Sequence, residues 1–178
     1  MSDRDLNSYN SIRIAGVVRE SIVDGPGLRF VVFCQGCPHD CKGCHNMATH
    51  DFSAGYDCDI SKILEAIDQN PLLDGVTFSG GEPMCQPEAF LQLAREVKKR
   101  NLSIVTYTGY TYEELLKLSE ENESIEQLMS MIDLLIDGRF IESQRDLTLL
   151  FRGSANQRII DMNLTREKGA ITLAEKYY

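Results

Sequence analysis

The chain has 178 residues, with 18 Lys and Arg against 27 Asp and Glu, so its net charge is −9. This length favours one domain over residues 1–178 and is sufficient for a buried core. The chain shows no run of basic residues typical of nucleic-acid binding and no apolar stretch long enough for a membrane span or signal peptide. We therefore expect a cytoplasmic protein that binds neither nucleic acid nor membrane, and whose six cysteines are ligands or free thiols.

The first part of the chain predicts two strands and then a loop rich in cysteine. Residues 12–18 form an apolar run of strand length, and the sequence Asp-Gly-Pro-Gly at 24–27 is a turn signal. Residues 29–33 have the apolar character of a buried strand, and the cysteines begin directly after it.

Beyond the cysteines, the sequence predicts alternating helices and strands. Strands are expected at 76–78, 103–107 and 132–136, and less regular patterns at 158–160 and 170–173 are compatible with strands. Helices are expected at 60–67 and 87–101, and after capping boxes at Thr111 with Glu114 and at Ser124 with Gln127.

The alternation indicates an α/β fold with a mainly parallel sheet. Eight βα units need about 250 residues, which is more than this chain has. We therefore expect a partial, open parallel (β/α) barrel of five or six strands. Loops after parallel strands meet at one edge, so the cysteine loop and the segments 79–83, 108–110, 137–139 and 152–158 are predicted to converge there.

Four cysteines lie within 11 residues, and three of them, Cys37, Cys41 and Cys44, have the spacing C-x3-C-x2-C. Three thiolates at this spacing suit an iron–sulfur cluster in which one iron keeps an open position. Two alternatives stay open from the residues alone. If Cys34 joins the set, a structural zinc site is possible, although its two C-x2-C pairs are unusually close together. A closed four-cysteine electron carrier is the other, although the order of spacings differs from that of ferredoxins.

A second motif, Gly80-Gly81-Glu82, follows the strand expected at 76–78. Two glycines allow a backbone to approach a ligand closely, and the carboxylate of Glu82 is a suitable acceptor for an ammonium group. The same three residues are also compatible with an ordinary turn between a strand and a helix.

Together the two motifs resemble those of the radical S-adenosylmethionine (SAM) enzymes. The resemblance implies that Cys37, Cys41 and Cys44 hold a 4Fe-4S cluster whose fourth iron is chelated by SAM. It also implies that Gly80, Gly81 and Glu82 line the methionyl end of SAM, and that the backbone around Gly43, Cys44 and His45 holds the adenine. Many family members have an aromatic residue at the position of Gly43, so stacking by that side chain is absent here.

Further motifs at 24–29, 36–46, 137–140 and 152–158 resemble the activases of glycyl radical enzymes. They are most similar to the branch that activates anaerobic (class III) ribonucleoside-triphosphate reductase. The resemblance implies that a reductant such as flavodoxin reduces the cluster, that SAM is cleaved, and that a hydrogen atom is removed from a glycine of the reductase. The alternatives are an activase of formate acetyltransferase, a small-molecule radical SAM enzyme of the deazaguanine synthase type, and an iron–sulfur electron carrier.

Several residues near these motifs have open roles. Cys34 is expected to be a buried thiol rather than a ligand, and His39 and His45 are expected to serve loop packing rather than iron binding. Asp137 is expected either to contact the cofactor or to stabilise its own loop. Three arginines are expected either to dock an acidic partner or to form surface ion pairs: Arg139, Arg152 and Arg158.

Overall fold

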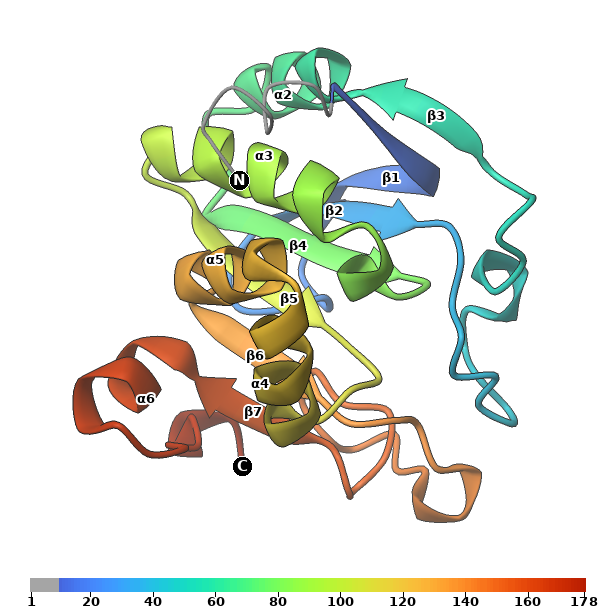
Figure 1. Ribbon diagram of the computed structural model, residues 1–178, viewed down its shortest axis with the longest axis vertical. Coiled ribbons are helices and arrows are strands. Elements are labelled where there is room, and N and C mark those ends of the chain that lie inside the picture. The colour runs from blue at the N-terminus through green and yellow to red at the C-terminus, as the bar shows by residue number, and fades with distance from the viewer. Residues whose placement is uncertain (1–9) are drawn as a thin grey trace.

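The computed structural model describes residues 10–178, and its framework is one seven-stranded sheet in the order β3-β1-β2-β4-β5-β6-β7 (Figure 1). The strands are β1 (Ser11–Ser21), β2 (Arg29–Cys34), β3 (Tyr56–Asp59), β4 (Gly75–Gly80), β5 (Ser103–Tyr107), β6 (Leu134–Asp137) and β7 (Arg158–Asp161). The two edge strands, β3 and β7, do not pair with each other among the described residues, so the sheet is open.

The centre of the sheet is parallel and its outer strands are antiparallel. β2, β4, β5 and β6 pair in parallel, with Val76 of β4 opposite Phe30 on one side and Ile104 on the other. β1 pairs antiparallel with both β2 and β3, and β7 pairs antiparallel with β6. The predicted α/β class and open sheet are therefore confirmed, with seven strands in place of the five or six expected.

The edges of the sheet account for the differences from prediction. β3 was not predicted, because its sequence Tyr-Asp-Cys-Asp is mostly exposed and lacks a buried apolar pattern. Residues 158–160 form β7 as expected, but the segment 170–173 makes only an isolated bridge between Leu173 and Ile160. Edge positions have fewer buried neighbours, so their sequences have weaker hydrophobic patterns.

The helices are α2 (Ile60–Asp68), α3 (Pro87–Lys99), α4 (Tyr112–Glu121), α5 (Glu123–Met131) and α6 (Met162–Lys168). The capping box of Thr111 and Glu114 is confirmed at the start of α4. The second predicted box is wrong, because Asn122 caps α5 by accepting a hydrogen bond from the Ser124 N–H at 2.9 Å. None of the helices in residues 10–178 is long and apolar enough to span a membrane.

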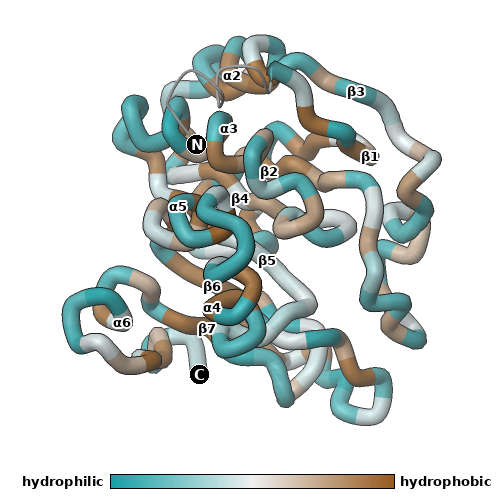
Figure 2. The backbone as a smooth tube through the Cα atoms, viewed as in Figure 1, coloured by the Kyte–Doolittle hydropathy of each residue, from teal (hydrophilic) through white to brown (hydrophobic). Residues whose placement is uncertain are grey.

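The main core lies between the sheet and the helices that pack on it. Helix α3 packs against α5 and β5, and the rings of Phe78 and Phe90 lie 4.9 Å apart with no exposed surface. Figure 2 shows hydrophobic residues concentrated in the central strands, with hydrophilic residues on the outer turns of the helices. Burial of this apolar surface is the main stabilising term of such a fold.

A buried arginine ties the parallel strands together at their amino-terminal ends. Arg29 is 1% exposed and donates to the Ser103 hydroxyl at 2.6 Å, the Thr77 hydroxyl at 3.1 Å and the Val76 carbonyl at 2.7 Å. Burial lowers the pKa of Arg29 to about 10. A Cβ at Gly75 would lie 2.4 Å from its Nη1, so the glycine makes room for the guanidinium. Arg29 therefore has a structural role at the edge opposite the cysteine loop.

Candidate functional site

The loops after the parallel strands meet at one edge of the sheet, the one formed by the carboxyl-terminal ends of these strands. β2 leads into the cysteine loop (residues 35–55), β4 into residues 81–86, β5 into residues 108–111 and β6 into the β6–β7 loop (residues 138–157). β7 begins at this same edge because it is antiparallel, so Arg158 lies opposite Asp137. Glu82 contacts both His39 of the cysteine loop and Gly109 of the loop after β5. These contacts join three of the loops, which confirms that they converge as predicted.

The cysteine loop is anchored near its ends and more open in its middle. The Cys37 N–H donates to the His50 carbonyl at 3.1 Å, which pairs the two sides of the loop. Cys37, Cys41 and Cys44 are free thiols of intermediate exposure, and the last two lie between the anchoring residues. Cys34 is fully buried at the end of β2, which confirms its predicted burial.

Backbone amides act on the half-exposed sulfurs of the cysteine loop. The Sγ of Cys44 accepts a hydrogen bond from the N–H of Asn46 at 3.4 Å. Burial raises the pKa of Cys37, and the backbone amide of His39 opposes this effect. Burial raises the pKa of Cys41, and the backbone amide of Phe140, in the β6–β7 loop, opposes this effect. Hydrogen bonds to sulfur stabilise thiolates and tune the potential of iron–sulfur clusters.

The three thiols fit a cluster of positively charged irons. Burial raises the pKa of Cys37 to about 11 and also raises the pKa of Cys41, so both remain protonated without a cation nearby. Coordination to iron reverses this balance, since a metal binds the thiolate form. In the part of the chain that the structure describes, no group of three His, Cys, Asp or Glu side chains is placed so that it could hold a single metal ion. The ligands of a cluster bind separate irons and do not need that arrangement.

The glycine pair lies directly against the start of the cysteine loop. Gly80 has a φ of +96°, and a Cβ there would lie 2.6 Å from the backbone N of Cys34. A Cβ on Gly81 would lie 2.2 Å from the carbonyl oxygen of Gly36. The N–H of Glu82 donates to that same carbonyl at 2.8 Å. Both glycines are therefore required for the close approach of the two loops.

The Glu82 carboxylate is the centre of the contacts between the loops. It has no exposed surface and accepts hydrogen bonds from the N–H groups of Met84 at 3.0 Å and Gly109 at 2.8 Å and from the Thr108 hydroxyl at 3.0 Å. The Nε2 of His39 lies 2.8 Å from its Oε2. A carboxylate has about four lone-pair sites. An additional ammonium group therefore reaches Glu82 only by displacing one of these donors.

His39 joins the cysteine loop to three neighbouring loops. Its ring is 4% exposed, and its Nδ1 accepts from Arg139 Nε at 3.3 Å, which assigns the ring hydrogen to the Nε2 that faces Glu82. The ring also packs edge-on against Tyr110 with 4.5 Å between centroids. A Cβ on Gly109 would lie 2.2 Å from this ring, so Gly109 provides its space. The predicted packing role of His39 is confirmed.

Asp137 and two of the arginines also have partners within the chain. Asp137 is 1% exposed and accepts hydrogen bonds from Arg158 and from the backbone N–H at the start of α4 at 2.8 Å. Arg158 also pairs with Glu113 at 2.7 Å, and this contact lowers the pKa of Glu113 to about 2. The guanidinium of Arg152 lies 4.1 Å from the ring centroid of Tyr178. These contacts favour a stabilising role at the β6–β7 loop over binding of an acidic partner.

The residues predicted to lie beside the adenine are on the outer part of the cysteine loop. Gly43 is exposed with a φ of +72°, and a Cβ there would lie 3.0 Å from Glu142 Oε1. Cys44 is of intermediate exposure and His45 is exposed. The geometry leaves their backbone accessible, and the contact with adenine stays a prediction.

Sequence reasoning missed one residue that supports the loop. Gln86 accepts from the Arg13 N–H at 2.9 Å and donates to the carbonyl oxygens of Arg13 at 2.9 Å and Gln35 at 3.3 Å. It therefore fixes the start of the cysteine loop to β1. The only sequence signal was its position shortly after the glycine motif.

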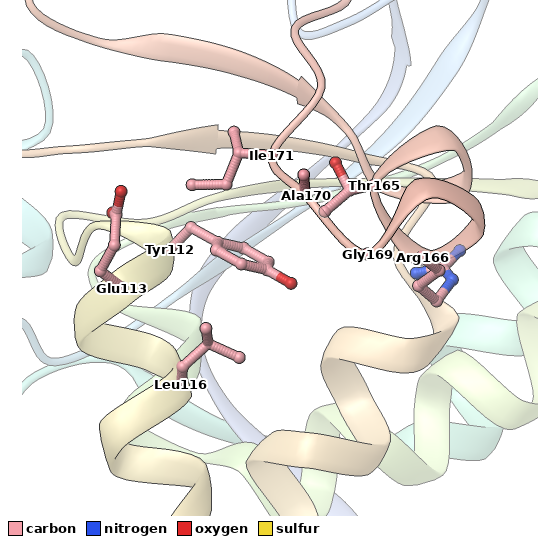
Figure 3. Close-up of a pocket in the computed structure, with 8 residues that line it drawn as sticks. All are labelled: Tyr112, Glu113, Leu116, Thr165, Arg166, Gly169, Ala170 and Ile171. Carbon is pink, nitrogen blue, oxygen red and sulfur yellow. The ribbon is translucent and has the colours of Figure 1, made fainter.

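A separate cavity of about 340 Å³ lies between α4 and α6 (Figure 3). It is lined by Tyr112, Glu113, Leu116, Thr165, Arg166, Gly169, Ala170 and Ile171. None of these residues belongs to the cysteine loop or to the glycine motif. The cavity is therefore distinct from the site formed at the edge of the sheet.

Comparisons with known proteins agree with the iron–sulfur chemistry of this site. The family model described as a 4Fe-4S single cluster domain matches residues 23–160, most of the chain. The anaerobic ribonucleoside-triphosphate reductase-activating protein of Vibrio cholerae is 39% identical over 146 residues, which cover 78% of this chain and 90% of that protein. The protein of the same name from Haemophilus influenzae is 38% identical over 148 residues, with the same coverage.

More distant proteins also align. The activating protein of the same name from Enterobacteria phage T4 is 32% identical and covers 77% of this chain and 86% of its own. Among solved structures, QueE from Escherichia coli aligns with a TM-score of 0.49 at 19% identity, over 62% of this chain and 58% of that one. On the sequence relatives, which the chain covers almost completely, the chain belongs to the family of anaerobic ribonucleoside-triphosphate reductase-activating proteins.

Proposed function

We propose that this protein cleaves SAM reductively at a 4Fe-4S cluster and generates a glycyl radical on anaerobic ribonucleoside-triphosphate reductase. The observation that supports it most is the trio of half-exposed thiols in the loop that the glycine motif contacts closely. The names of the relatives supply the reductase as the partner. A one-electron donor such as flavodoxin and a cytoplasmic location complete the proposal.

In this proposal, Cys37, Cys41 and Cys44 would hold the cluster, and SAM would bind at the iron that has no protein ligand. The methionyl end lies along Gly80, Gly81 and Glu82, and the adenine lies along the backbone of Gly43, Cys44 and His45. When bound, the cluster would supply the one electron for reductive cleavage of SAM and so the chemistry that removes a hydrogen atom from a glycine of the reductase.

The residues around the site hold these parts in place. Glu82 and His39 fix the cysteine loop against the loops after β4 and β5, so the thiols are held before any ligand binds. Gly81 keeps the glycine motif in backbone contact with the cysteine loop. Rigid placement of this kind reduces the reorganisation that a reaction needs.

The test is anaerobic reconstitution with iron and sulfide, followed by SAM cleavage with a chemical reductant and by spin-resonance detection of a glycyl radical on added reductase. Cys34→Ala should retain the cluster, because its buried thiol is not a proposed ligand. Cys37→Ala, Cys41→Ala and Cys44→Ala should each lose SAM cleavage. Full cleavage in any of these three variants would refute the ligand assignment.

The choice of partner separates the competing activities. An activase of formate acetyltransferase should produce the radical on that enzyme and not on the reductase. A small-molecule enzyme of the deazaguanine synthase type should turn over its substrate without a protein partner. An electron carrier should bind the cluster and leave SAM intact.

A further inference from the structure

The β6–β7 loop is a long connection beside the candidate site. It spans residues 138–157 and contains a single short 3₁₀ turn, Glu142–Gln144. Loops longer than about 12–15 residues without regular structure are uncommon in compact domains, and they frequently carry function. In Figure 1 this loop extends from the same edge of the sheet as the cysteine loop.

The base of this loop is held firmly by side chains of its own. Gln157 Nε2 donates to the Gly138 carbonyl at 2.9 Å, and Asn156 Nδ2 donates to the Arg139 carbonyl at 2.9 Å. An additional bridge pairs Arg145 with Ser154. The two sides of the loop are therefore fixed to each other, and its tip is presented in a defined orientation.

The tip presents hydrophobic side chains to solvent. Leu147 is 84% exposed and Leu150 is 54% exposed, and we refer to these two residues as the leucine tip. The Asp146 carboxylate accepts hydrogen bonds from the N–H of Thr148 at 2.8 Å and from the Thr148 hydroxyl at 2.7 Å. These two bonds shape the turn at residues 146–148, which carries Leu147. Single exposed leucines are common on protein surfaces. Two on one braced turn beside a reactive site are compatible with a binding surface.

The loop that carries the leucine tip is continuous with the candidate site. Its Glu142 forms an ion pair with Lys42 of the cysteine loop at 3.1 Å, and a Cβ on Gly43 would lie 3.0 Å from the Oε1 of Glu142. Two of the arginines of the loop, Arg139 and Arg152, have partners within the chain. The leucine tip is thus an exposed apolar group on the loop that contacts the cysteine loop, and the leucine side chains are accessible to a partner.

We propose that the leucine tip docks against an apolar surface of the reductase next to the segment that carries the target glycine. This inference rests on the proposed function, since only a protein substrate requires a docking surface at this edge. Burying one leucine side chain on binding strengthens association by about tenfold or more. Loss of the leucine tip should therefore weaken binding of the reductase without blocking the reaction once bound.

The experiment titrates reductase against a fixed concentration of the reconstituted protein and measures glycyl radical yield. The double variant Leu147→Ser with Leu150→Ser is compared with Leu72→Ser. Leu72 is a matched control because it is 74% exposed and lies just before β4, at the opposite edge of the sheet. We expect the double variant to need at least about tenfold more reductase for half-maximal yield and to reach the same plateau. Leu72→Ser should follow the wild-type curve.

The outcomes separate this inference from the proposed function. An unchanged half-saturating concentration in the double variant overturns the docking role, whereas no radical from the wild type overturns the proposed function instead. If the double variant loses bound iron, the titration is repeated with Leu147→Ser alone, since that exposed side chain contributes little to folding. An unchanged half-saturating concentration in this single variant then overturns the docking role. Self-association of the wild type that the double variant abolishes, with an unchanged titration curve, assigns the surface to a second copy and also overturns the inference.

Discussion

Replacement of Glu82 by glutamine distinguishes a structural carboxylate from one that serves only a ligand. Glutamine keeps the volume but has one acceptor oxygen and an NH₂ group, so it cannot accept all the hydrogen bonds that now reach Glu82. At least one buried donor among the N–H groups of Met84 and Gly109 and the Thr108 hydroxyl would be left unpaired.

The size of the effect follows from these contacts. Hydrogen bonds to a charged group contribute about 1.5–3 kcal/mol, and an unpaired buried donor costs about 1–3 kcal/mol. We expect Glu82→Gln to lower the free energy of unfolding by about 3 kcal/mol. For a protein of this size, each 1 kcal/mol shifts Tm by about 2–4 °C, so Tm should fall by about 6–12 °C.

The assay is thermal unfolding under anaerobic conditions, with the cluster reconstituted and without SAM, monitored by circular dichroism. Glu142→Gln is the control, because the Glu142 side chain is 51% exposed and its partner Lys42 is 90% exposed. An exposed pair of this kind contributes about 0–1 kcal/mol to stability, so the Tm of the control variant should change little. If Glu82→Gln left Tm within about 2 °C of the wild type but abolished SAM binding, Glu82 would serve the ligand alone and the reasoning would be wrong.

Three further predictions concern the same framework. Gly81→Ala places a Cβ 2.2 Å from a backbone carbonyl of the cysteine loop, so this variant should bind less iron after reconstitution, measured by iron analysis. Gly109→Ala displaces the ring of His39 and should increase hydrogen exchange in the cysteine loop, measured by mass spectrometry. Burial raises the pKa of Asp133, but Lys98 and a backbone N–H of β5 outweigh it and lower the pKa below 3.8. Asp133 therefore stabilises the fold above that pH, so the urea-measured deficit of Asp133→Asn at pH 7 should shrink as pH falls below about 4. An equal deficit at pH 3 would contradict this account.

The sequence predicted the parts of the fold that have strong buried patterns. The strand at 103–107 and the capping box of Thr111 and Glu114 agree with the structure. The cap by Asn122 was missed, because Asn and Ser favour the same position and the sequence does not rank them. The antiparallel direction of β7 was also missed, since strand direction depends on tertiary pairing rather than on residue pattern.

The candidate site was predictable to the level of loops but not of contacts. The spacing of Cys37, Cys41 and Cys44 located the cysteine loop, and the glycine motif located its neighbour. That His39 lies against Glu82 was not predictable, because this contact joins residues 43 positions apart through the order of the strands. Long-range side-chain pairs of this kind become visible only when the sheet is assembled.

The internal pairing at this edge of the sheet has a consequence for how a partner is recognised. Glu82, Asp137 and Arg158 are committed to contacts within the chain, so breaking them to bind a partner would cost the stability they provide. The same commitment holds the thiols and the glycine motif in place before a ligand arrives, which favours a fixed geometry over an induced one. Recognition therefore has to depend on groups outside this network. The leucine tip is such a group, since it can bind an apolar surface without weakening the hydrogen bonds that hold the cysteine loop.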